Sequence, residues 1–299
     1  MSSITTSLSF LASLRQAIFK TLQWRLLLLS LALLWLPTLL LALPLWRILA
    51  SQLDHTVQAP DWARRFDLLL WSELARLFEA SGALLGGSGL FALAGTVALM
   101  PFLHAMGMAA ARETRRLNLG ELLHGGLRHY GPMLRLLLWS LIPLAAIAGV
   151  AAAALHAVDS YGEHAVLESD VNHLRWAVLA VAALLTLIWH ACMEAGRGWL
   201  AFAIRGRSAL GALLQGIKLV LARPWRSLGL YLSITLKAAV LLAVLGLLRA
   251  HLPGLTMPAF IAGLLLTQLL SLVNVLASYA KLFAMRELTA QQHASSLSA

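Results

Sequence analysis

The sequence has little charge. Only 12% of its 299 residues are Asp, Glu, Lys or Arg, whereas soluble domains carry about 25%. Hydrophobic residues make up 60%, and the mean hydropathy is +0.79. This composition excludes a soluble globular class and predicts an integral membrane protein.

Cysteine is nearly absent, because Cys192 is the only one in the sequence. A single cysteine allows neither an intrachain disulfide nor a CxxC-type metal site, and we expect no metal. The sequence also lacks a nucleotide-binding glycine loop, a Walker-type lysine and a DNA-reading module. Without these motifs the chain cannot by itself be an ATP-driven pump, although it could be the membrane subunit of one. We also expect no cofactor.

Acidic residues are fewer than basic ones, with 13 Asp and Glu against 23 Lys and Arg, for a net charge of +10. The basic residues lie beside apolar segments and do not cluster with aromatic residues that could stack on bases. We therefore predict contacts with lipid headgroups, anionic ones in particular, and no nucleic acid. The predicted headgroup contacts are Arg115, Arg116, Arg128, Arg205, Arg207, Lys218, Arg223 and Arg226.

A short pattern occurs twice and precedes two long apolar segments. Residues 119–125 read LGELLHG and residues 210–216 read LGALLQG, and a proline and an arginine follow each copy. Near the N-terminus, RLLLLS at residues 25–30 resembles RLLLWS at residues 135–140. The pattern predicts three tandem units of a basic amphipathic helix plus a membrane hairpin. The units would cover about residues 1–111, 112–204 and 205–290.

Six apolar segments are long enough to cross a hydrocarbon core of about 30 Å. They are the stretch between Arg25 and Arg47, residues 80–111, 136–157 and 176–204, a stretch that ends near residue 248, and residues 257–283. Amphipathic helices are expected at residues 10–22 and, on the outer surface, at residues 62–78. Residues 1–290 would form one membrane domain, and residues 291–299 a disordered tail.

The distribution of basic residues predicts the orientation of these spans. Basic residues gather at the N-terminus, in the two linkers that carry the repeated pattern, and at the C-terminus. The other three loops are poor in basic residues or are acidic. The positive-inside rule therefore predicts an all-α protein of six transmembrane helices with both termini in the cytoplasm, in a bacterial inner membrane.

Five polar side chains inside the predicted spans are candidate site residues, because burying such groups in lipid is costly. They are His104, His190, Glu194, Lys237 and Asn274. An ion pair between Glu194 and Lys237 near mid-membrane could gate a path for a proton or a substrate. Alternatively, Lys237 extends toward the cytoplasmic face and Glu194 pairs with Arg197, so that these groups only hold helices together.

The second functional hypothesis is an intramembrane enzyme, a protease-like hydrolase that uses Ser88 or the histidines and Glu194 in the spans. Residues 86–89 read GGSG, which resembles the GxSG pattern of rhomboid intramembrane proteases. In that family the serine lies on a later span and pairs with a histidine on the last one. Here Ser88 opens the second span and the sixth has no histidine, and close helix packing explains the glycines equally well.

The overall layout resembles a broad bacterial group of six-span membrane proteins, which includes the membrane domain attached to some glycerophosphodiester phosphodiesterases. The resemblance rests on the basic lead-in, the glycine-rich second span and the two copies of the repeated pattern. It implies a six-span membrane protein. No phosphodiesterase domain is recognisable in these residues, so the resemblance implies no such activity.

These features together predict a non-enzymatic, multi-pass inner-membrane protein. We expect it to act as a transporter-like or envelope-organising component. Its expected partners are membrane lipids, and both homo-oligomers and complexes with other membrane subunits stay open.

Overall fold

The computed structural model describes residues 23–53, 68–113, 115–162, 168–203, 208–252 and 256–297. Within these ranges all regular structure is α-helical. The six helices that are long and apolar enough to cross a membrane are α2 (Trp24–Leu53), α5 (Gly82–Arg112), α6 (Leu119–Gly162), α7 (Glu168–Phe202), α9 (Pro224–His251) and α10 (Met257–Leu297). The predicted all-α, multi-pass membrane class is confirmed. The repeat and the orientation of the termini stay predictions.

Two shorter helices complete the described part of the chain. Helix α4 (Leu68–Ala80) precedes α5 and overlaps the helix predicted on the outer surface. Helix α8 (Ala209–Ala222) carries the second copy of the repeated pattern. The amphipathic helix predicted at residues 10–22 and the two arginines Arg205 and Arg207 lie outside the described residues.

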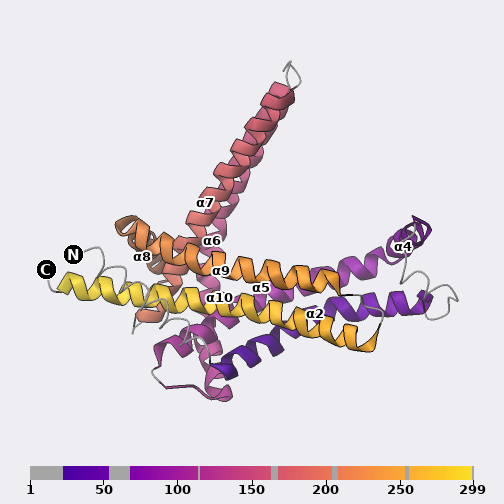
Figure 1. The fold of residues 1–299 in the computed structure, drawn as a ribbon. Helices are drawn as coiled ribbons and strands as arrows, with labels where there is room; N and C mark the ends of the chain where they lie inside the picture. The colour runs from indigo at the N-terminus through magenta and orange to yellow at the C-terminus, as the bar shows by residue number, and fades with distance from the viewer. Residues whose placement is uncertain are drawn as a thin grey trace.

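The six long helices converge at one end of the molecule. Figure 1 shows α2, α5, α9 and α10 extending in one direction from this end, while α6 and α7 leave it together as a hairpin that points elsewhere. The buried cluster lies where they converge. It draws on the first halves of α2, α6 and α9, the second halves of α5, α7 and α10, and the short helix α8. Beyond it, large apolar side chains such as Phe91, Val150 and Leu265 are exposed, as expected for surfaces that face lipid.

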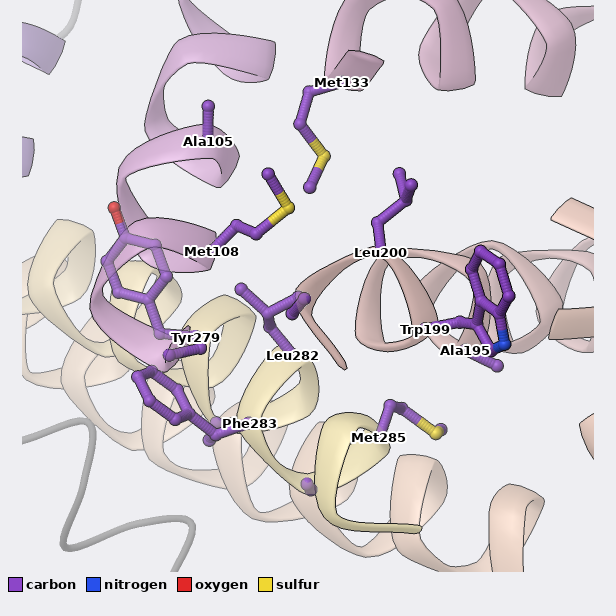
Figure 2. Packing of buried hydrophobic residues seen from close by; sticks show 14 of the residues in the cluster. Ala105, Met108, Met133, Ala195, Trp199, Leu200, Tyr279, Leu282, Phe283 and Met285 are labelled. Atoms are coloured by element: carbon purple, nitrogen blue, oxygen red, sulfur yellow. The ribbon is translucent and has the colours of Figure 1, made fainter. Parts of the chain in front are cut away.

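Small residues allow the helices to approach closely at this end. A Cβ atom on Gly107 of α5 would lie 2.5 Å from the Tyr279 ring of α10, and one on Gly198 of α7 would lie 2.6 Å from Cβ of Met285. Figure 2 shows how Met108, Leu282 and Leu200 fill the space between α5, α10 and α7. Because lipid supplies little hydrophobic drive for helix association, close packing of this kind has to hold the helices together.

The two copies of the repeated pattern begin helices but continue differently. Asn118 and Glu121 form a reciprocal cap at the start of α6, each backbone N–H bonding the other side chain at 2.8 Å. Ser208 caps α8 through the N–H of Gly211. α6 then runs without a break for 44 residues through Pro132, whereas α8 ends before Pro224, which begins α9. The predicted surface helix and the span after it are therefore one helix in the first copy and two in the second.

Helix α10 continues to Leu297, into the stretch for which composition predicted a disordered tail. The ring of His293 lies 5.1 Å from that of Phe202 at the end of α7, measured between centroids. Gln291, Gln292 and Ala294 at the start of this stretch are good helix formers. This contact and these propensities explain why the helix extends so far.

Candidate functional site

A buried ion pair lies on α7, within the region where the helices converge. Nη1 of Arg197 is 2.8 Å from Oε1 of Glu194, and the two residues are 7% and 1% exposed. Residues three apart on a helix are neighbours on its surface, so the pair forms within one element. Lys237 is exposed on α9 and makes no ion pair with a described residue. Of the two pairings considered for Glu194, the structure therefore forms the one with Arg197.

His104 of α5 joins this pair across a helix interface. Nη1 of Arg197 lies 2.9 Å from Nε2 of His104, and Nδ1 of His104 lies 2.7 Å from the carbonyl oxygen of Met100. A guanidinium can only donate, so Nε2 must accept and Nδ1 must carry the proton that is donated to Met100. His104 is therefore a neutral imidazole with both nitrogens bonded. It connects α5 to the charged groups of α7.

A second cation, Lys281, lies near the carboxylate of Glu194. Lys281 of α10 and His190 of α7 are close enough to Glu194 to interact with it electrostatically. Nζ of Lys281 lies 5.3 Å from the centre of the Tyr231 ring, and the His190 ring lies 6.0 Å from the same ring. With Arg197 and Lys281 against Glu194, the cluster has a surplus of positive charge. Oε2 of Glu194 is buried and has no hydrogen-bond partner among the described residues.

A cavity of about 680 Å³ lies between α2, α5 and α10, next to this cluster. Most of its wall is apolar, and its polar groups include His104, Asn274 and Ser278. The side chains of Asn274 and Ser278 make no hydrogen bond to a described residue, so they can bond to an occupant. This volume is typical of small-molecule sites. The structure thus places two of the five predicted polar residues, His104 and Asn274, on one cavity and links a third, Glu194, through Arg197.

A buried hydrogen bond between α2 and α10 lies beside the cavity, and it involves none of the predicted site residues. The hydroxyl groups of Ser30 on α2 and Tyr279 on α10 lie 2.7 Å apart. The Tyr279 hydroxyl also lies 3.2 Å from the carbonyl oxygen of Leu103 on α5. These bonds tie together the three helices that form the cavity. The one sequence signal for Ser30 is its place in the RLLLLS stretch.

The basic residues of the linkers are mostly exposed, as headgroup contacts require. Arg115 bonds both carboxylate oxygens of Glu121, at 2.7 and 3.2 Å, and hydrogen bonding to Glu121 raises the pKa of Arg115 above its ordinary value. Exposed as well are Arg116, Arg128, Lys218 and Arg226, while Arg223 is half-buried. Their contact with lipid stays a prediction.

The groups proposed for an intramembrane hydrolase are not assembled around Ser88. Its Oγ donates to the carbonyl oxygen of Leu85 at 3.0 Å. His104 lies on the same helix 16 residues further along, which places it about 24 Å away at 1.5 Å per residue. A serine nucleophile needs a base within hydrogen-bond reach. Within the described residues, no three His, Cys, Asp or Glu side chains are close enough to hold a metal ion.

Comparison with known proteins assigns no family to this chain. No protein-family model, no protein of curated function and no solved structure matches it. The resemblance to the bacterial six-span group stays a prediction.

Proposed function

We propose that the protein is a transporter-like component of the bacterial inner membrane, and that the cavity between α2, α5 and α10 binds an amphiphilic, lipid-like molecule. The observation that carries this proposal is the cavity itself, about 680 Å³ with apolar walls and unpaired polar groups on one side. An apolar wall suits an acyl or other hydrophobic chain. The amide of Asn274 and the hydroxyl of Ser278 can hydrogen-bond its polar end.

The position of the cavity supports an occupant that arrives from the lipid. Leu41 of α2 and Leu93 of α5 line it, yet they are 43% and 61% exposed. These side chains therefore border both the cavity and the outer surface of the helices. A molecule dissolved in the bilayer can therefore reach the cavity from the outer surface of the helices without crossing the buried cluster.

The charged cluster supports a role beyond packing. Ionisable groups in membrane helices are costly, and they commonly mark substrate or ion pathways. His104 forms part of the cavity wall and is bonded to Arg197, so an occupant that contacts His104 also acts on the buried ion pair. The surplus positive charge of Arg197 and Lys281 over Glu194 favours an occupant whose polar end is anionic or rich in acceptors.

A pair of neighbouring substitutions tests the cavity. Thr96 lines it, whereas Val97 on the same helix turn does not and is 50% exposed. We expect Thr96→Phe to weaken binding of a diazirine-bearing fatty acid about tenfold or more, because a large side chain would overlap the occupant. Val97→Phe should bind it like the wild type. Photolabelling of the purified protein in nanodiscs, followed by peptide mapping, measures both.

Equal labelling of the Thr96→Phe and Val97→Phe variants would show that the amphiphile binds elsewhere.

Movement of the occupant is tested separately, with the wild type and Glu194→Gln reconstituted in vesicles that contain the same fatty acid. Transport predicts that Glu194→Gln lowers the flux while the folded protein still binds. If the wild type binds the fatty acid but does not move it across the membrane, transport is wrong and an envelope-organising role takes its place.

A further inference from the structure

A second cavity, of about 600 Å³, lies where α5 ends and the chain turns into α6. Its wall comes from the last turn of α5, the linker that follows, and the first turns of α6. The reciprocal cap of Asn118 and Glu121 fixes the start of α6. Gly125 fixes its approach to α5, because a Cβ there would lie 2.5 Å from Cβ of Ala109. The cavity is therefore formed by well-packed elements.

Basic side chains gather on this wall. Arg112 is held in place, since its Nη2 donates to the carbonyl oxygens of Leu200 and Ala203 at the end of α7, at 2.7 and 2.8 Å. Its Nε is buried and has no hydrogen-bond partner among the described residues. Arg128 is exposed on α6 and makes neither a hydrogen bond nor an ion pair with a described residue. The wall also includes the imidazoles of His124 and His129.

The carboxylates nearby do not balance these charges. Glu121 is already bonded to Arg115 and to the N–H of Asn118. The other carboxylate on the wall, Glu113, is exposed. Arg112 meanwhile feels the repulsion of both Arg128 and Arg286. Like charges repel one another, and an anion bound between them relieves that repulsion.

We propose that this cavity binds a phosphate group. Guanidinium groups match phosphate oxygens in geometry and in charge, imidazole N–H groups can add hydrogen bonds, and the N-terminus of a long helix contributes a favourable dipole. The cavity lies at the end of a membrane-spanning helix, so the phosphate can belong to a lipid headgroup or to a soluble phosphate ester. This site is separate from the cavity between α2, α5 and α10, and it does not depend on the function proposed for that cavity.

Three probes separate the possible sources of the phosphate. Dioctanoyl phosphatidylglycerol has both tails and phosphate, dioctanoylglycerol has the tails alone, and glycerol 3-phosphate has the phosphate alone. Each is titrated into the purified protein in a neutral detergent at constant ionic strength, and the thermal unfolding midpoint is measured. The variants are Arg128→Gln and, as a control, Arg135→Gln, which makes the same charge change on the same helix outside the cavity wall.

We expect phosphatidylglycerol to raise the midpoint of the wild type and of Arg135→Gln. Arg128→Gln should need about tenfold more of it, as loss of a charge-assisted hydrogen bond predicts. Arg128 has no partner in the described part of the chain, so this variant should fold. If glycerol 3-phosphate also raises the midpoint, and Arg128→Gln needs about tenfold more of it, the phosphate site is supported and its ligand is a soluble ester. Equal weakening in both variants, or stabilisation by dioctanoylglycerol alone, would overturn the phosphate site, as would no stabilisation by any probe.

Discussion

Arg197 connects the polar groups of two helices through a single nitrogen. Its Nη1 donates to Oε1 of Glu194 at 2.8 Å and to Nε2 of His104 at 2.9 Å. Burying a guanidinium without a carboxylate costs several kcal/mol, so Glu194 is needed to keep Arg197 in place. Arg197 in turn orients the imidazole that forms part of the cavity wall. Glu194 thus acts on the cavity without lining it.

This arrangement predicts unequal effects for substitutions of Glu194 and Lys237, the two residues whose ion pair was one alternative offered by the sequence. Glu194→Gln should lower the free energy of unfolding by about 3 kcal/mol, because it leaves the charge of Arg197 uncompensated. Lys237→Ala should change it by less than about 0.5 kcal/mol, because Lys237 is exposed and makes no ion pair with a described residue. Reversible unfolding of the single variants and of the double variant in one detergent measures all three values.

The double variant tests whether Glu194 and Lys237 interact with each other. Residues that do not interact should give additive effects within about 0.5 kcal/mol. If Lys237→Ala were as destabilising as Glu194→Gln, and the double variant no worse than either, the two residues would be a coupled pair.

For single residues, the sequence can indicate contacts within one helix but not contacts between helices. The three-residue spacing of Glu194 and Arg197 makes their pairing one of the two alternatives that the sequence offers, because residues three apart are neighbours on a helix. The bond from Arg197 to His104 could not be predicted, since it depends on how α5 and α7 pack. The same holds for Ser30 and Tyr279, which are 249 residues apart in the chain and 2.7 Å apart in space.

At the scale of elements, glycines of the repeated pattern set the approach of each linker helix to the preceding span. Gly125 lies against Ala109 of α5, and Gly216 lies against the backbone of Cys192 and Gly196 on α7. Both contacts are too close for a Cβ atom. The two copies of the pattern therefore share a packing role, which sequence identity alone could only suggest.

Gly216→Ala should accordingly destabilise the protein. A methyl group there meets the carbonyl oxygen of Cys192 and the backbone of Gly196, neither of which can rotate away. We expect a loss of about 2–3 kcal/mol in the free energy of unfolding, as for overpacking of a tight core. Gly229→Ala on α9 is the matched control, because nothing lies within 4 Å of a Cβ there. It should be neutral or slightly stabilising, since Ala favours helix over Gly. Equal losses in both variants would contradict this packing role.

The number of long helices could be predicted from apolar length, but their ends could not. Pro132 and Pro224 follow the repeated pattern at similar distances, yet α6 runs through the first and α9 begins at the second. Arg223 before Pro224 has a non-helical backbone, with φ −138° and ψ 63°. A proline is compatible with the first turn of a helix or with a kink inside one. Tertiary packing chooses between these two outcomes, so the sequence cannot.

For the whole molecule, both proposed sites border the end where the helices converge. The larger cavity includes His104 beside the buried cluster, and the basic cavity includes Arg112, which is bonded to the end of α7. Away from this end the helices diverge, with α6 and α7 forming a separate hairpin (Figure 1). The ordered packing that a binding site needs is thus concentrated at one end of the spans, the end that the distribution of basic residues assigns to the cytoplasm.

That assignment predicts which side of the membrane each end of α6 faces. Arg116 precedes α6 and Tyr161 lies near its far end, and both are exposed. A helix of 44 residues is about 66 Å long, more than the hydrocarbon core of about 30 Å, so both ends should reach water. Positive-inside orientation predicts that Arg116→Cys reacts with an impermeant maleimide in inside-out vesicles and Tyr161→Cys in right-side-out vesicles. The wild type is the control, because Cys192 is buried. The reverse pattern would invert the topology, and labelling of both variants from one side would show that α6 does not cross the membrane.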